Sequence, residues 1–567
     1  MGKKRLEETC ECDSQTNLHA KSTSQPYPVN ALLKQIPQTE KILNDPAIIE
    51  LMKTCPPKVV NSITKSVIND VRQSVLDRCA KLSAEKSPSS DNSQESLLKG
   101  VGISALESSV SSISIVDEII TRTNDYMTPS LRRVINATGI IMHTNLGRSA
   151  LAPSATQAVC DVARGYSTLE FNPKSMSRGS RHSHCEKLIC ELTGAPAAIA
   201  VNNNASAVMM ILSAFAKGGE GIVSRGELVE IGGSFRIPDI MDFSGCTMVE
   251  VGTTNKTHLN DYKIAISDNT KMFLKVHPSN YQIQGFCQHV EIDELRKLAD
   301  SVNSGRGFGD FECAANRTLG SANSDANNTA KSGTDGTANS GTKSTANEIL
   351  VYEDLGSGAL IDLEFIAKCQ EPNVFTSLAK GCDLISFSGD KLLVGPQAGI
   401  IIGRRDLIEA LKSHPLARVL RLDKMTLAAL ESTLRLYLDP ERAKAEIPTL
   451  SMLCADAQEI LARAQKLTDY LSKIANSTSI STSIQSGESY AGGGALPMVA
   501  LNSYCVAVSF NRGNAGNCAA FIGNRAGTPV IARVHNDMLL FDTRTLISAE
   551  DEIAEISAAV NEYLAGC

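Results

Sequence analysis

Short apolar segments alternate with amphipathic segments through the middle of the chain, from Leu131 to about Asp423. The apolar segments have the length of strands, and the amphipathic segments between them have the period and length of helices. This alternation is typical of a mostly parallel β-sheet covered by helices on both faces. We therefore expect an α/β domain over residues 128–425, with strands at residues 197–201, 221–223, 247–251, 272–276, 349–352, 384–387 and 399–402.

The pattern changes on both sides of this domain. Upstream, Val and Ile recur at three- and four-residue spacing between Val59 and Val75, which predicts one buried helix face, and a second helical pattern covers Ser114 to Asp125. We assign residues 28–127 to a helical domain and the polar residues 1–27 to a disordered tail. Downstream, helical patterns continue to Ile474, and strand-like segments at 499–510 and 530–541 precede a helix at 549–564. These features predict a smaller α+β domain over residues 426–567.

Residues 303–347 interrupt the alternating pattern of the α/β domain. The part from Ser321 to Asn347 consists almost entirely of Ser, Asn, Thr, Gly, Ala and Asp, and it has no apolar period. Such a segment cannot bury a core. We expect a disordered surface insertion here.

Composition narrows the possible functions. The chain has 567 residues, enough for about three domains, and a net charge of −7, which argues against a surface that is basic throughout. Aromatic residues make up 4%, too few for a stacking platform for single-stranded nucleic acid. The sixteen cysteines show no zinc-site spacing, so we expect no metal. We found no signal peptide and no apolar run long enough to span a bilayer, so we expect a cytoplasmic protein without membrane contact.

One lysine follows a buried-looking strand in a Ser/Gly turn. Residues 386–393 read SFSGDKLL, in which Lys391 comes directly after Asp390. An earlier apolar strand at 349–352 ends in Glu353 and Asp354. Lysines after strands are usually solvated, but ligands bind such sheets at the carboxyl ends of the strands, where Lys391 and Asp354 both lie. Pyridoxal phosphate (PLP) enzymes need a lysine for the aldehyde and a carboxylate for the pyridine nitrogen, and this pair could supply both.

Two further clusters could bind anions. Residues 202–207 (NNNASA) follow a strand and open a helix, where free backbone N–H groups suit a phosphate; an ordinary Asn/Ser N-cap explains them as well. Arg418 and Arg421 would share a helix face and could hold an oxyanion, or they could be surface arginines paired with Asp423 and Glu409. Likewise, Lys65, Arg72 and Arg78 of the upstream helix form either a solvated face or an RNA contact.

Several longer motifs carry a family resemblance. Residues 134–148, 178–181 (RGSR), 201–207 (VNNNASA), 225–236 (RGELVEIGGSFR), 388–391 (SGDK) and 414–424 (HPLARVLRLDK) occur in order and closely resemble bacterial L-seryl-tRNA(Sec) selenium transferases. The resemblance implies the fold type I architecture of PLP enzymes, which is aspartate aminotransferase-like. It also implies conversion of seryl-tRNA(Sec) to selenocysteyl-tRNA(Sec) with selenophosphate, through a PLP-bound aminoacrylyl-tRNA intermediate.

The resemblance also implies roles for individual residues. Lys391 would form the Schiff base with PLP, and Asp354 would face the pyridine nitrogen. Asn204, Ala205 and Ser388 would lie near the cofactor phosphate. The anionic selenium donor would be bound by Arg148, Arg418 and Arg421. The domain at 28–127 would bind the tRNA, and the chains would assemble as a homo-oligomeric ring of dimers, such as a decamer.

The chain departs from the family pattern at two positions, and one alternative function stays open. Val394 stands where a glycine commonly follows the Lys-Leu-Leu run, and Pro278 follows His277 where a threonine is usual. The alternative is a PLP-dependent lyase of the same fold that acts on a small phosphorylated amino acid or amino sugar. The helical N-terminal domain and the pair Arg418 and Arg421 favour the tRNA enzyme.

Overall fold

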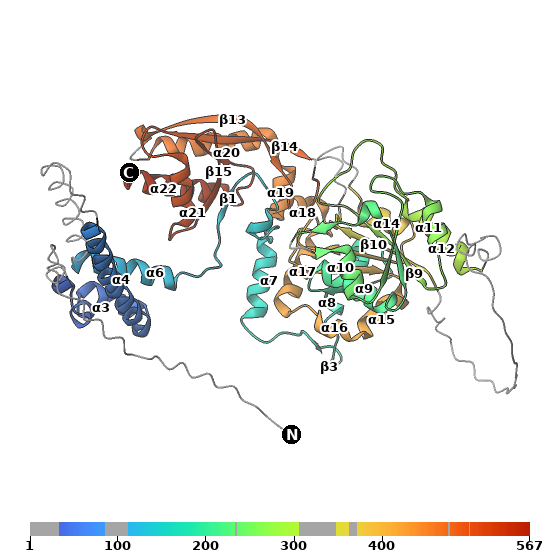
Figure 1. The fold of residues 1–567 in the computed structure, drawn as a ribbon. Coiled ribbons are helices and arrows are strands. Elements are labelled where there is room, and N and C mark those ends of the chain that lie inside the picture. Colours follow the sequence, from blue (N-terminus) through green and yellow to red (C-terminus); the bar gives the residue numbers. More distant parts are fainter. Residues whose placement is uncertain are drawn as a thin grey trace, which may run out of the picture. The chain divides into compact units, whose positions relative to one another are not determined.

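The structure is a computed structural model, and it describes residues 33–84, 112–232, 235–305, 348–361, 371–474, 477–497 and 499–567 (Figure 1). The tail expected at 1–27 and nearly all of the insertion expected at 303–347 lie outside the described residues. The chain divides into two compact units, Met1–Arg132 and Arg133–Cys567.

The first unit is helical in its described residues. Its core contains Ile48, Val60, Val67, Ile115 and Ile119, all almost fully buried, so the predicted apolar face of the long helix is confirmed. The helices that supply this core are α2 (Thr39–Leu43), α3 (Pro46–Thr54), α4 (Pro57–Ala84) and α6 (Ser112–Met127).

A seven-stranded sheet forms the centre of the second unit. The strand order is β4-β12-β11-β10-β9-β5-β8, and only β12 runs antiparallel to its neighbours. All seven predicted strands are present, and together they make up this sheet. They are β4 (Ala197–Val201), β5 (Glu220–Ser224), β8 (Thr247–Val251), β9 (Thr270–Val276), β10 (Leu350–Gly356), β11 (Leu384–Ser388) and β12 (Gly399–Gly403). The expected α/β class with a mostly parallel sheet is confirmed.

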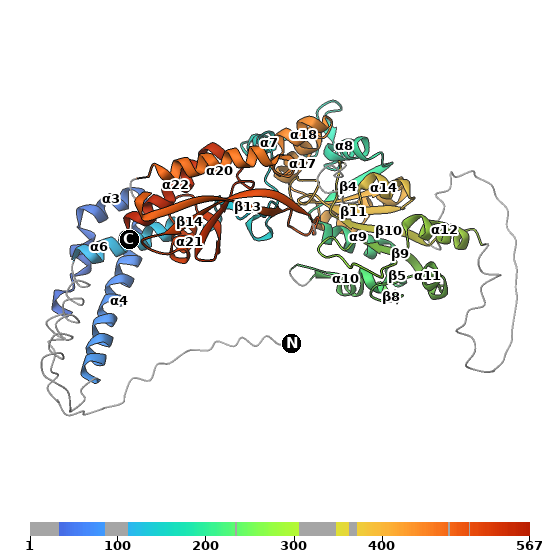
Figure 2. The same cartoon turned by 90° about the horizontal axis from the view of Figure 1, so that it is seen from above.

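Helices cover both faces of this sheet. One face packs on α9 (Asn204–Phe215), α10 (Ile237–Phe243) and α15 (Arg405–Ser413). The other face packs on α11 (Leu259–Ala265) and α12 (Ile292–Asn303) at one end, and Figure 2 shows α12 beside β10 and α11 beside β5 and β8. At its other end it packs on α7 (Pro153–Ala163), α8 (Ser183–Thr193), α14 (Val374–Ala379), α17 (Lys424–Leu436), α18 (Pro440–Glu446) and α19 (Pro448–Cys454).

A second core belongs to a smaller α+β domain. Its five-stranded sheet has the order β1-β15-β16-β14-β13, in which β1 (Ile135–Ala137) pairs parallel with β15. The other strands are β13 (Ile480–Tyr490), β14 (Ala500–Phe510), β15 (Val530–His535) and β16 (Met538–Asp542), and the helices are α20 (Ala457–Ser472), α21 (Ala515–Asn524) and α22 (Ala549–Ala565). The smaller domain therefore takes its first strand from the segment that precedes the large sheet. No helix in the described part of the chain is long and apolar enough to cross a membrane.

Candidate active site

The loop after β11 holds Lys391 in the interior. The lysine is 4% exposed. Backbone hydrogen bonds fold the loop back on itself, because Gly395 donates to the carbonyl of Gly389 at 2.7 Å and Leu392 donates to the carbonyl of Ser357 at 2.9 Å. The loop is therefore anchored both internally and to the segment that follows β10.

The Lys391 amine lies in a small polar space between three chain segments. Its Nζ donates to the Ser279 hydroxyl at 3.4 Å. A Cβ atom on Gly356 or on Gly494 would lie 3.8 Å from Nζ, so both glycines border this space directly. Burial lowers the pKa of Lys391; the nearby charge of Asp354 opposes that shift, and the charge of Arg148 adds to it. The site thus makes the uncharged, nucleophilic amine easier to form than it is for a lysine in water.

Asp354 lies at the end of the neighbouring strand β10 and is 1% exposed. The side-chain amide of Asn204 donates to its Oδ1 at 2.8 Å. Burial raises the pKa of Asp354, while this hydrogen bond and the charge of Lys391 oppose the shift. Because β10 and β11 are parallel neighbours, their carboxyl ends bring Asp354 and Lys391 to the same edge of the sheet.

The start of α9 lies at the same edge. Asn203 caps the helix, since its side chain accepts a hydrogen bond from the backbone N–H of Ser206 at 2.8 Å. Gly399 permits this arrangement because a Cβ there would lie 2.2 Å from the Asn203 carbonyl oxygen. Ser388 pairs with Gly399 across β11 and β12. The N-cap interpretation is thus confirmed, and Ala205, in the first turn, and Ser388 both belong to this edge.

The three candidate arginines have different surroundings. Arg148 forms an ion pair with Asp390 at 3.0 Å, directly beside Lys391. Arg421 lies 3.7 Å from Glu170 and forms an isolated β-bridge with Val201, at the end of β4. Arg418 is exposed on α16 (Pro415–Val419). The expectation that Arg418 and Arg421 share a helix face is wrong, because the helix ends at Val419.

Comparison with known proteins decides the family. The model for L-seryl-tRNA selenium transferase matches residues 134–311 and 335–547 of this chain. The chain belongs to the L-seryl-tRNA selenium transferase family. The L-seryl-tRNA(Sec) selenium transferase of Moorella thermoacetica is 41% identical over 535 residues, which cover 94% of this chain and 97% of the relative. The enzyme of the same name from Alkaliphilus oremlandii is 39% identical over 533 residues, with coverage of 94% and 99%.

Solved structures show more distant similarity. D-Glucosaminate-6-phosphate ammonia-lyase matches with a TM-score of 0.47 and 18% identity, and covers 77% of this chain and 100% of its own. Thermus thermophilus aspartate aminotransferase matches with a TM-score of 0.35 and 13% identity, with coverage of 77% and 94%. For this member of the selenium transferase family, the fold assignment depends on the sheet order and on the family match.

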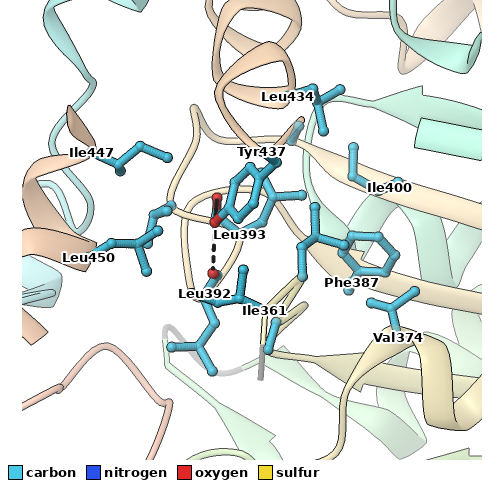
Figure 3. Packing of buried hydrophobic residues seen from close by; sticks show 14 of the residues in the cluster. Ile361, Val374, Phe387, Leu392, Leu393, Ile400, Leu434, Tyr437, Ile447 and Leu450 are labelled. Atoms are coloured by element: carbon cyan, nitrogen blue, oxygen red, sulfur yellow. Dashed lines mark hydrogen bonds between the residues drawn. The ribbon is translucent and has the colours of Figure 1, made fainter. Parts of the chain in front are cut away.

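The structure adds residues to the site that the sequence interpretation missed. Ser279 and Gly494 lie beside the Lys391 amine, although they come from the segment after β9 and from the connection between β13 and β14. Tyr437 is buried at the end of α17, and its hydroxyl donates to the carbonyl of Leu393 at 2.9 Å, as Figure 3 shows. The run of glycines at 492–494 was the available signal for Gly494. Sequence spacing gave no signal for Ser279 or Tyr437.

Val394, noted above as a departure from the selenium transferase pattern, has unusual backbone geometry. It is fully buried and has a φ of 55°. A β-branched residue rarely adopts this left-handed conformation, which a glycine adopts without cost. Its N–H donates to the carbonyl of Lys391 at 2.9 Å. The loop that carries the lysine is thus closed by a strained residue.

Proposed function

We propose that this protein converts L-seryl-tRNA(Sec) to L-selenocysteyl-tRNA(Sec), with selenophosphate as selenium donor and PLP as cofactor. The observation that carries the proposal is the buried arrangement of Lys391, Asp354 and Asn204 in a chain of this family. Burying a lysine and a carboxylate together costs folding stability. Groups that a fold keeps at such a cost are candidates for functional residues.

The residues at this edge of the sheet fit PLP. Lys391 would hold the aldehyde carbon, and Asp354 would hold the pyridine nitrogen in its protonated form. The first turn of α9, with Asn204 and Ala205, and Ser388 would bind the phosphate, because N–H groups at a helix start have no partner within the helix. The Oδ1 atom of Asn204 is buried and lacks a hydrogen-bond partner among the described residues, so it can accept one more bond.

The chain's own groups then have separate tasks. Bound PLP supplies an electron sink for the Cα of the seryl group. The Lys391 amine, whose pKa burial lowers, can accept the Cα proton at Nζ and return it after selenium has replaced the hydroxyl. Burial raises the pKa of Asp354, and the hydrogen bond from Asn204 opposes that rise and so supports the carboxylate form that a protonated pyridine nitrogen would need.

The remaining roles concern the two substrates. Arg148, Arg418 and Arg421 would bind selenophosphate, since guanidinium groups suit multivalent oxyanions. Arg148 would then exchange its bond to Asp390 for one to the donor. The helical region at 28–127 would bind the tRNA, and the protein would act in the cytoplasm as a ring of dimers.

The deciding experiment is incubation of the purified full-length protein with seryl-tRNA(Sec), selenophosphate and PLP. We expect selenocysteyl-tRNA(Sec) as product. We also expect a visible absorption band from bound PLP, and Lys391→Ala should lose both the band and the product. A wild-type protein that acquires no band with added PLP would contradict the cofactor assignment. A protein with the band that leaves seryl-tRNA(Sec) unchanged would contradict the substrate.

A further inference from the structure

A cavity of about 740 Å³ opens at the carboxyl edge of the large sheet, on the face opposite Asp354. Its walls come from the ends of β5, β8, β9 and β10, from the segment at 281–291 and from α14. Glu353 of β10 lines this cavity, whereas its neighbour Asp354 bonds to Asn204 of α9. Successive side chains of a strand point to opposite faces of the sheet. The end of β10 therefore supplies one carboxyl to the cavity and one to the face on which α9 packs.

One layer of residues separates the cavity from Lys391. Pro278 and Tyr281 line the cavity, and Ser279 between them accepts the hydrogen bond from the Lys391 amine. Glu371 also lines the cavity, and its charge acts on Lys391 by raising the lysine pKa. The residues that flank Ser279 therefore place the wall of the cavity next to the Lys391 amine.

The charges in the walls are largely paired with one another. Lys275 contacts Glu227 at 2.6 Å, and Lys380 contacts Glu291 at 2.5 Å. The third lysine of the wall, Lys256, lies over the Phe286 ring, so the wall as a whole offers little affinity for a free anion such as selenophosphate. The rest of the wall is rich in amide and hydroxyl side chains, namely those of Asn255, Gln282, Gln288, Asn373 and Thr376. These groups suit a neutral polar ligand with many donors and acceptors.

One buried carboxyl completes the wall. Glu353 is 3% exposed, and its Oε2 has no hydrogen-bond partner in the described part of the chain. A buried polar atom without a partner is costly, and a ligand that donates a hydrogen bond removes this cost. Ribose hydroxyls and the amino group of a nucleobase are such donors.

We propose that this cavity takes the 3′-terminal nucleoside of the aminoacyl-tRNA substrate. The inference rests on the proposed function, because the seryl group is esterified to the terminal ribose and both must lie near Lys391 together. The cavity volume falls within the range of roughly 300–1,000 Å³ typical of small-molecule sites. The cavity would therefore select an amino acid attached to a nucleoside over free serine.

Two variants test the cavity through steady-state kinetics. Gln282→Trp places a large ring on an exposed wall position, where folding is little affected, and Glu353→Gln replaces the buried carboxyl with its isostere. We expect each variant to raise the KM for seryl-tRNA(Sec) at least tenfold, with an unchanged PLP band and an unchanged KM for selenophosphate. Glu552→Gln is the control for loss of a buried carboxylate, because Glu552 is 2% exposed but lies in the smaller domain, where it is paired with Arg133.

Photo-crosslinking locates the nucleoside directly. A seryl-tRNA(Sec) that carries an azidoadenosine at its 3′ end should crosslink to peptides containing residues 253–257 or 281–291. A crosslink confined to other peptides, or a selenophosphate KM that rises together with the tRNA KM, would overturn the inference. Those outcomes leave the proposed function intact if the wild type still forms selenocysteyl-tRNA(Sec), so the two failures are distinguishable.

Discussion

Removal of one hydroxyl, in Tyr437→Phe, tests whether the end of α17 positions Lys391, the lysine proposed to hold PLP. The Tyr437 hydroxyl donates to the carbonyls of Leu393 at 2.9 Å and Leu392 at 3.5 Å, the two residues that directly follow Lys391. Burial raises the pKa of Tyr437, so the hydroxyl remains a donor throughout the accessible pH range. Phenylalanine keeps the ring packing in the cluster of Figure 3 and deletes only the donor.

The size of the effect follows from the lost donor. A buried carbonyl left without a partner costs about 1–3 kcal/mol. In the variant without PLP, the loop can rearrange so that the Leu393 carbonyl finds another hydrogen-bond donor. If PLP binding requires the original loop conformation, this whole free-energy cost lowers the affinity for PLP. At about 1.4 kcal/mol for each factor of ten, the PLP dissociation constant should rise by roughly 5- to 150-fold.

The assay is PLP titration of the apoprotein, followed through its absorption band, with a matched tyrosine as control. Tyr262 is also almost fully buried and is hydrogen-bonded to the backbone of Ser224, but it lies in α11. Tyr262→Phe should lower thermal stability to a similar degree and leave PLP affinity unchanged. If Tyr437→Phe keeps wild-type PLP affinity while losing stability as the control does, Tyr437 supports the fold without positioning Lys391.

Three other substitutions give measurable outcomes. Asn204→Ala removes a hydrogen bond that holds the pKa of Asp354 down. The acid limb of the pH profile of kcat/KM should therefore move up by about one to two pH units, and an unmoved limb would contradict this reasoning. Val394→Gly should be at least as stable to heat as Val394→Ala. Glycine relieves the strain of the left-handed φ (about 1–2 kcal/mol), which offsets its larger backbone entropy in the unfolded chain and the loss of the buried Cβ. A glycine variant that is clearly less stable than the alanine variant would argue against strain at this position. Arg421→Ala should raise the KM for selenophosphate by about tenfold or more with PLP binding intact, whereas Arg435→Ala on the exposed side of α17 should not.

The large sheet was predictable because its strands are short apolar runs that are buried on both faces. The burial of all five residues of β4, β11 and β12 shows this directly. The sequence interpretation missed β13 and β1 for physical reasons. β13 is mostly polar and has only one fully buried residue in its first eight, so its sequence has little strand signal. β1 has three residues and pairs with β15, almost four hundred positions away.

Only the site residues that lie at the carboxyl ends of strands could be predicted from the sequence. Lys391 and Asp354 could be paired because parallel neighbouring strands end at one edge. Ser279 and Gly494 reach the lysine through tertiary packing, for which neither periodicity nor spacing carries a signal. The spacing of Arg418 and Arg421 was misleading, because i, i+3 neighbours share a face only while the helix continues, and α16 stops at Val419.

The end of β10 connects these observations. Asp354 faces α9 and acts on the charge of Lys391, whereas Glu353 faces the cavity on the other side of the sheet. Both carboxyls are buried, and burial raises the pKa of each, so the strand end carries two costly groups in succession. A fold under selection for stability alone would replace such groups with apolar residues. Two adjacent buried carboxyls that face two separate spaces are better explained by two ligand groups, the cofactor on one face and the end of the tRNA on the other.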